Sequence, residues 1–205
     1  MINLNVKVIF DEPVLGTSSS NPDIHREYIA SNAPDAVKLE EEVASIGVDE
    51  VFEKGMTVFG RDDNDNPIVW DYQWKGYFKD AFKALRKIPN SKCGAIKSYK
   101  QEIDGLVFVY PRKIPIAVNG ELGICQRPLR ASTAQGERVA LASSESIPAG
   151  SSMEFTIRLL NKSHEKPIIE ALDYGRLRGF GQWRNSGKGR FHYEILSRTE
   201  DDKLF

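Results

Sequence analysis

The chain has 205 residues, of which 40% are hydrophobic and 28% charged, and its formal net charge at pH 7 is −1. This length is sufficient for one large domain or two small ones with a buried core, and the near-neutral charge argues against indiscriminate binding to polyanions. No apolar run reaches the roughly 18 residues that a membrane-spanning helix needs. Cys93 and Cys125 lack the spacing of a zinc site or of a disulfide framework.

The start of the chain, Met1-Ile2-Asn3-Leu4, lacks the basic and then apolar pattern of a secretory signal peptide. Together with the two isolated cysteines, this predicts a cytoplasmic protein with reduced thiols. The sequence shows no metal-ligand spacing and no cofactor fingerprint, so we expect neither a metal nor a cofactor.

The charge is distributed unevenly along the chain. Residues 1–70 contain 14 Asp and Glu against 5 Lys and Arg, whereas residues 71–205 contain 15 against 23. The basic second part suits an anionic partner, or a head-to-tail contact with the acidic part of another copy. The two parts could also neutralise each other within one fold, and composition alone leaves both interpretations open.

The first 55 residues predict one strand, a loop and an acidic helical insertion. Residues 2–10 alternate apolar and polar side chains, which is typical of a half-buried strand. Residues 13–20 form a Ser-rich loop. Residues 21–55 contain helix-capping residues and predict one helix through 25–29 and a second, acidic helix over 35–46.

The segment from residue 56 to residue 86 predicts a hairpin followed by a helix. Dense turn signals at 61–67 separate two apolar stretches, which is typical of a hairpin. From Lys75 to Arg86, apolar side chains recur at three- and four-residue spacing and indicate an amphipathic helix. Its remaining positions include Lys75, Lys79 and Lys83, so one face is basic. This face suits phosphate binding, but it could simply keep the helix in solution.

The second half of the chain predicts further strands at 106–110, 113–118, 124–127, 139–142 and 152–159, a helix from 163 to about 174, and a last strand at 190–196. Without the insertion, the order is strand, helix, strands, strand, helix, strand. This is the layout of an RRM or ferredoxin-like domain. We therefore predict a single α+β domain over residues 1–205, with an antiparallel sheet, two packing helices, a glycine-rich loop and the helical insertion at 21–55.

The most distinctive motif runs from Gly179 to Arg190 and reads GFGQWRNSGKGR. Its two Gly-x-Gly pairs allow sharp turns and a close approach of another chain to the backbone. Its cations and exposed amides would attract phosphates, and Trp183 could stack on a base. The spacing matches neither a P-loop nor G-x-G-x-x-G. The alternative interpretation is a flexible hairpin with scattered charge.

Three segments resemble, in the same order, the RAMP superfamily, the repeat-associated proteins that form the RNA-binding backbone of CRISPR effector complexes. The segment Arg61 to Val69, followed by Lys75 to Phe82, is similar to the stretch where the family's hairpin leads into its first long helix. Residues 134–154 resemble its turn into the strand before the second helix. The segment Gly179–Gly189 resembles its glycine-rich loop, which packs near bound RNA. The resemblance covers residues 1–16 and 56–197.

Two features depart from the family pattern. The chain is shorter than most backbone subunits, whose thumb-like hairpin is usually longer, and residues 21–55 have no counterpart. A divergent relative, such as a phage or prophage protein that reuses the fold, would have these features. Fold likeness alone does not supply function.

The resemblance implies that single-stranded RNA runs along the sheet or the groove beside it. The residues expected to contact it are Lys75, Lys79, Arg127, Arg130, Gly179, Gly181, Trp183, Arg184, Gly187, Lys188, Gly189 and Arg190. Stacking of Trp183 on a base would contribute about 1–3 kcal/mol. The segment 126–130 is the second basic element, although it could instead be a solvated loop beside a strand.

Some members of the family cut RNA, with a histidine as general acid or base or an aspartate near the first strand. The candidates in this chain are His192, beside the glycine-rich loop, and His25 with Asp23. A metal-independent ribonuclease needs a base for the 2′-hydroxyl and a cation for the transition state. His192 with Arg190 or Lys188 could supply both. Each histidine could equally have a surface or packing role.

Three hypotheses remain at the level of sequence. The first is a non-catalytic protein that binds single-stranded RNA, self-associates head to tail or assembles with other effector-like subunits, and has no membrane partner. The second is an endoribonuclease of the same fold. The third is a phage-encoded anti-defence or protein-interaction factor that uses the acidic segment 21–55.

Overall fold

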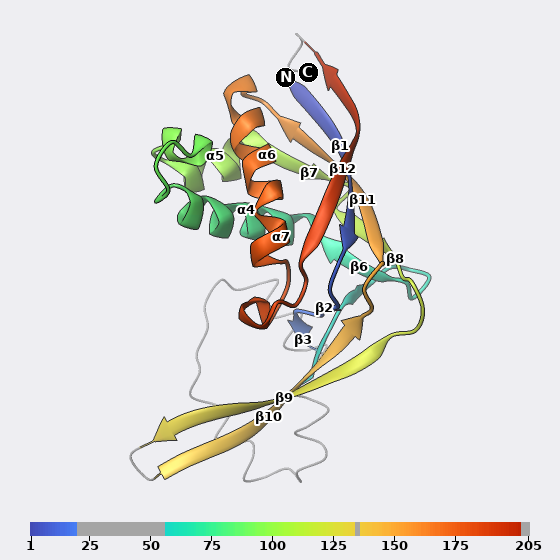
Figure 1. The fold of residues 1–205 in the computed structure, drawn as a ribbon. Coiled ribbons are helices and arrows are strands. Elements are labelled where there is room, and N and C mark those ends of the chain that lie inside the picture. The colour runs from blue at the N-terminus through green and yellow to red at the C-terminus, as the bar shows by residue number, and fades with distance from the viewer. Residues whose placement is uncertain (20–55, 134–135, 202–205) are drawn as a thin grey trace.

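The computed structural model describes residues 1–19, 56–133 and 136–201 (Figure 1). The expected acidic insertion at 21–55, with Asp23 and His25, lies outside the described residues. No observation on the structure therefore bears on the two expected helices of that insertion or on the hypothesis that it docks a protein partner.

An antiparallel sheet built around β1 (Ile2–Phe10) forms the centre of the molecule. β1 lies between β11 (Ser152–Leu159) and β12 (Phe191–Glu200), and β7 (Val107–Tyr110) pairs with β11. The spatial order of these four strands is thus β12-β1-β11-β7. Along the chain, helices lie between β1 and β7 and again between β11 and β12. This is the ferredoxin-like arrangement, and it confirms the predicted fold class.

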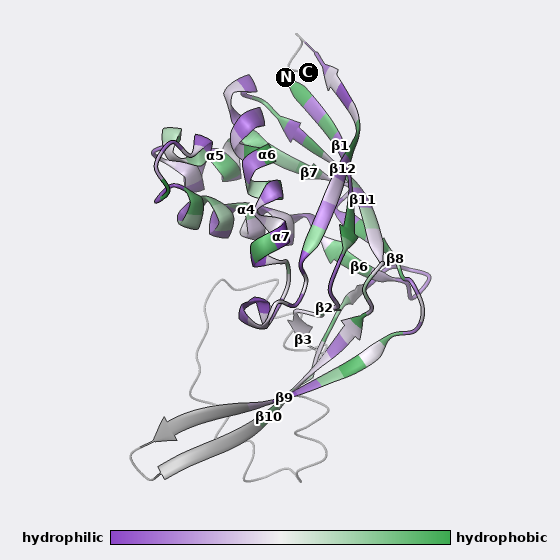
Figure 2. Ribbon diagram, in the orientation of Figure 1, coloured by the Kyte–Doolittle hydropathy of each residue, from purple (hydrophilic) through white to green (hydrophobic). Residues whose placement is uncertain are grey.

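The helices gather on one side of this sheet (Figure 1). The two that match the predicted packing helices are α4 (Asp71–Leu85) and α6 (Glu165–Asp173). Two shorter ones, α5 (Tyr99–Leu106) and α7 (Gly175–Arg178), and short 3₁₀ turns at Lys92–Ala95, Lys162–His164 and Arg184–Ser186 complete the helical layer of the described residues. Alternate residues of β1 face this layer and are buried, and Figure 2 shows the alternation as green and purple bands. None of the described helices is long and apolar enough to cross a lipid bilayer.

Trp74 is the central side chain of the core. It is fully buried on α4, and its ring centre lies 4.5 Å from that of Phe155 and 4.6 Å from that of Phe180. Such aromatic contacts add to the stabilisation from burial alone. Because Phe180 belongs to the glycine-rich loop, this cluster ties the loop to both the first helix and the sheet.

Three further strands extend the sheet beyond β11. They are β8 (Lys113–Ala117), β6 (Pro67–Trp70) and β5 (Gly60–Arg61). β5 and β6 form the predicted hairpin. Helix α4 then begins at Asp71, four residues before the expected start. Gln73 explains the early start, because its side-chain oxygen accepts a hydrogen bond from the Trp70 amide at 2.8 Å and satisfies a group left free at the helix end.

A second sheet carries a long hairpin that projects away from the main sheet (Figure 1). The hairpin consists of β9 (Gly123–Thr133) and β10 (Gly136–Ile147), and the short strands β2 (Val14–Leu15), β3 (Ser18–Ser19) and β4 (Thr57–Val58) pair at its base. The sequence predicted only two separate short strands, at 124–127 and 139–142. Residues 130–138 are mostly small or polar, so they lack the alternation that reveals a strand.

Glu145 fixes the base of this hairpin. Its side chain is buried, accepts a hydrogen bond from the Phe59 amide at 2.9 Å and forms an ion pair with Arg61. Its backbone oxygen accepts a second bond from the Gly16 amide at 2.9 Å. A buried carboxylate needs such partners, so Glu145 holds three separate segments of the chain together.

Candidate nucleic-acid interface

The glycine-rich loop folds back on itself rather than forming an open hairpin. Gly179, Gly181, Gly187 and Gly189 all have positive φ, between 70° and 88°. The Phe180 amide donates to the Gly189 oxygen at 2.8 Å and closes the loop. A Cβ atom on Gly189 would lie only 1.9 Å from the Phe180 oxygen. The glycines are thus required by a close backbone contact as well as by the turns.

The loop is also attached to the segment that follows β1. The Gly189 amide donates to the Pro13 oxygen at 2.9 Å, and the Arg190 oxygen accepts from the Asp11 amide at 2.8 Å. With Phe180 inserted in the core, the loop is held at both of its ends. Because the backbone is fixed at both ends, the side chains between Phe180 and Gly189 project from a fixed framework.

Asp80 of α4 binds two arginines from the region of the loop. One oxygen of its carboxylate lies 3.1 Å from Nε of Arg178 and 2.7 Å from Nη1 of Arg184. Arg178 also donates to the Asn185 side chain at 2.7 Å. Arg184, which the sequence predicted as a phosphate ligand, therefore already has a carboxylate partner. Asp80 could not be singled out from the sequence, because nothing in the spacing of α4 indicates which segment crosses it.

Arg127 brings the long hairpin into contact with the loop. Its Nη2 atom donates to the Gln182 side-chain oxygen at 2.8 Å, and its guanidinium carbon lies 5.4 Å from the centre of the Trp183 ring. Gln182 in turn donates to the Gly16 oxygen at 3.0 Å. The two basic elements that the sequence predicted separately thus lie side by side. Arg130 lies three residues further along β9, opposite Val139.

Three side chains of the glycine-rich loop are available to a ligand. Trp183 is 41% exposed, Arg190 is exposed and Lys188 is half-buried. Among the described residues, no carboxylate forms an ion pair with Lys188 or Arg190. Together with Arg127, which contacts Trp183, they give the loop and the adjoining hairpin three cations and one exposed aromatic ring; we call these four residues the loop–hairpin surface. Cations and an exposed aromatic are the groups that bind a single nucleic-acid strand.

Lys75 and Lys79 do not belong to this surface. Lys75 donates to the Asp104 oxygen at 3.2 Å and lies 4.5 Å from the Phe108 ring centre. Lys79 pairs with the Asp104 carboxylate at 2.5 Å. Burial lowers the pKa of Lys75 below its ordinary value of 10.5. The two lysines thus connect α4 to α5 and β7, whereas Asp80 faces the glycine-rich loop.

His192 lies beside the loop and has an acidic partner. Its Nδ1 atom is 2.6 Å from the Asp11 carboxylate. By contrast, His164 is 2% exposed, and its Nε2 atom is 2.6 Å from Glu102. His164 is therefore buried at the start of α6, where its contact with Glu102 serves packing. Of these two histidines, only His192 is accessible to a substrate. No group of three or more His, Cys, Asp and Glu in the described part of the chain could hold a metal ion.

Comparison with known proteins gives structural matches only. No family model matches the chain, and no curated protein matches it. Among solved structures, a chain in the cryo-EM structure of the type III-B Cmr-beta bound to cognate target RNA aligns with a TM-score of 0.53. The fold of this protein therefore resembles that of the Cmr-beta chain. The alignment covers 97% of this chain at 12% identity, so the likeness concerns the fold alone.

This protein spans 60% of the length of the Cmr-beta chain that it matches. A chain of a type IV-B CRISPR complex aligns over 99% of this protein and 95% of its own length, with 11% identity and a TM-score of 0.47.

Proposed function

We propose that this protein binds single-stranded RNA without cutting it, as a RAMP-type subunit of a larger assembly. The observation that carries the proposal is the contact between Arg127 of the long hairpin and Trp183 of the glycine-rich loop, the loop that also carries Lys188 and Arg190. The likeness of the fold to a chain of an RNA-bound complex supports the choice of RNA.

Each part of the surface has a role in this proposal. Lys188 and Arg190 neutralise phosphates, because no ion pair within the described residues competes for them. Trp183 stacks on a base with its exposed face, while the guanidinium of Arg127 lies over its ring. Arg127 is therefore expected to orient the tryptophan as well as to add charge.

The assembly part of the proposal rests on charge. The acidic residues 1–70 and the basic residues 71–205 would attract each other between copies arranged head to tail. Analytical ultracentrifugation at low and high salt tests this directly. Oligomers that dissociate as salt increases support the proposal, and a monomer at all salt concentrations contradicts it.

The RNA proposal is tested by fluorescence anisotropy with a 30-nucleotide single-stranded RNA across a salt series. For Lys188→Ala/Arg190→Ala, we expect weaker binding and a salt dependence that is shallower by about 1.4 in log–log slope, which corresponds to two lost phosphate contacts. The matched control is Lys79→Ala, because the Lys79 side chain pairs with Asp104 and lies outside the loop–hairpin surface. No binding by the wild type at low salt would overturn the proposal.

A second candidate function is metal-independent RNA cleavage, and the contact between His192 and Asp11 favours it. The carboxylate 2.6 Å from Nδ1 can orient the imidazole so that Nε2 acts as a base, and Arg190 lies two residues away as a source of positive charge. Binding without cleavage needs only the loop–hairpin surface, so we place it first.

A further inference from the structure

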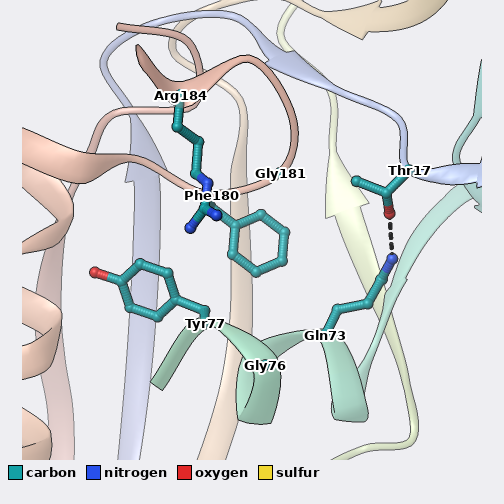
Figure 3. Close-up of a pocket in the computed structure, with 7 residues that line it drawn as sticks. All are labelled: Thr17, Gln73, Gly76, Tyr77, Phe180, Gly181 and Arg184. Carbon is teal, nitrogen blue, oxygen red and sulfur yellow. Dashed lines mark hydrogen bonds between the residues drawn. The ribbon is translucent and has the colours of Figure 1, made fainter. Parts of the chain in front are cut away.

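A small pocket lies on the inner side of the glycine-rich loop, between the loop and α4 (Figure 3). Its volume is about 210 Å³. Helix α4 contributes Gln73, Gly76 and Tyr77, the loop contributes Phe180 and Arg184, and Thr17 closes the remaining side. Pockets for drug-sized ligands start at about 300 Å³, so this one suits a single ring system rather than a whole nucleotide.

The walls of the pocket are aromatic and carry little net charge. Phe180 and Tyr77 are both buried; the Phe180 ring lies between the loop and α4, whereas the Tyr77 ring extends away from Thr17 and Gln73 (Figure 3), and its hydroxyl donates to the Ala171 oxygen at 2.7 Å. Burial raises the pKa of the Tyr77 hydroxyl well above its usual value of 10, so this group stays neutral. The Arg184 guanidinium is balanced by Asp80 at 2.7 Å. A bare phosphate, which needs uncompensated positive charge, is therefore a poor match.

The polar groups at the rim offer hydrogen-bond donors. Both polar atoms of the Gln73 side chain already have hydrogen-bond partners. Its oxygen accepts from the Trp70 amide, and its nitrogen donates to the Thr17 hydroxyl. The Thr17 hydroxyl accepts that bond and keeps its own proton free to donate. Arg184 uses Nη1 for Asp80 and can donate from its other nitrogens. Two donors beside aromatic rings match the carbonyl oxygens of a nucleobase.

We propose that this pocket receives one unstacked, carbonyl-bearing nucleobase, such as uracil, from the strand bound at the loop–hairpin surface. The flat base fits between the loop and α4, beside the edge of Phe180, and its carbonyl oxygens accept from Thr17 and Arg184. The inference deepens the proposed function and rests on it for the source of the base. It adds that one nucleotide leaves the stack and turns inward beneath the loop.

Gly76 gives a means of closing the pocket without disturbing the fold. A Cβ atom at this position would meet nothing within 4 Å. Gly76 also shares a helix face with Gln73 and Asp80, three residues before it and four after it, so a longer side chain would extend along the pocket wall. Gly76→Leu fills the pocket, and Gly76→Ala is the matched control that leaves most of it open.

The first experiment compares oligo(U) with an abasic ribose–phosphate oligomer of the same length. We expect Gly76→Leu to weaken oligo(U) binding about tenfold, the loss that one or two hydrogen bonds account for, with an unchanged salt slope because the phosphate contacts remain. Gly76→Ala should bind like the wild type, and the abasic oligomer should bind all three proteins equally. Equal loss for the abasic oligomer, or no loss for oligo(U), would overturn the pocket proposal.

The second experiment does not depend on strand binding. In ¹H–¹⁵N spectra, uridine should shift the Gly181 amide signal of the wild type but not that of Gly76→Leu, whereas inorganic phosphate should shift it in neither. If the wild type fails to bind RNA but responds to uridine, the proposed function fails and the pocket assignment stands. If RNA binds but uridine at millimolar concentration gives no shift, the pocket assignment fails alone. Equal shifts with adenosine, which has no carbonyl, would overturn the choice of base.

Discussion

The guanidinium carbon of Arg127, on the long β9–β10 hairpin, lies 5.4 Å from the ring centre of Trp183 in the glycine-rich loop. A cation this close to an indole face is attracted by the ring's quadrupole. The bond from Arg127 to Gln182, at 2.8 Å, holds the guanidinium in place. The hairpin and the loop are thus joined at the point where the proposed RNA surface lies, and the tryptophan keeps 41% of its surface exposed.

Trp183→Ala should weaken RNA binding by roughly five- to a hundredfold, because it removes one base–aromatic stack. The unfolding free energy should change little, since the ring lies largely outside the core. Anisotropy titrations and urea denaturation measure the two effects. Leu177→Ala is the control, because Leu177 lies on α7, just before the loop in the chain, and is also an exposed apolar side chain, at 72%. Equal affinity for the two variants would exclude stacking by Trp183.

Gly189→Ala should lower the free energy of unfolding by about 2 kcal/mol or more, because the new Cβ atom would collide with the Phe180 oxygen and the residue has a φ of 70°. Gly76→Ala should instead leave stability unchanged or raise it by about 0.5–1 kcal/mol, because that glycine lies within a helix with open space around it. Urea denaturation of both variants tests the difference. A Gly189→Ala protein as stable as Gly76→Ala would mean that the loop is not closed as described.

The wild type should bind RNA without cutting it in the presence of EDTA. Denaturing gels of a labelled RNA, incubated for hours, provide the measurement. Fragments ending in a 2′,3′-cyclic phosphate would instead support the second candidate function. In that case, His192→Ala and Asp11→Asn should both abolish the fragments, because the carboxylate 2.6 Å from Nδ1 orients the ring.

Glu170 should make stability depend on pH in the acid range. Burial opposes ionisation of this carboxyl, but hydrogen bonds from the Cys93 amide and the Ser91 hydroxyl outweigh it and hold its pKa below the ordinary value of 4.5. Because the folded-state pKa is the lower one, the stabilisation is complete above about pH 4.5 and is lost as the pH falls through the folded-state pKa.

Urea denaturation at a series of pH values measures this effect. Glu170→Gln should flatten the fall in unfolding free energy below pH 4.5. Glu154→Gln is the matched control, because Glu154 is exposed and lies 3.6 Å from Lys7. The same acid dependence in Glu170→Gln and the wild type would contradict the assignment. The neighbouring Cys93 thiol does not contribute to this pH dependence, because burial raises its pKa and keeps it protonated.

Elements with a strong apolar period could be predicted from the sequence. Apolar residues alternate with polar ones in β1 and β11, and they recur at helical spacing in α4 and α6, because each of these elements buries one face. These patterns were enough to predict the ferredoxin-like order. The long hairpin was predicted only in part, because its outer residues are small or polar and bury no regular face. The early start of α4 was missed because it depends on the side chain of Gln73.

The sequence by itself determined which residues of the glycine-rich loop are chemically suited to bind RNA, because composition and glycine spacing are local properties. Only the tertiary structure decided which of them are available. It placed Arg127 beside Trp183, paired Arg184 with Asp80, and turned Lys75 and Lys79 toward Asp104. A charge pattern along one segment does not specify its partners, because these are set by how distant segments cross in the folded chain.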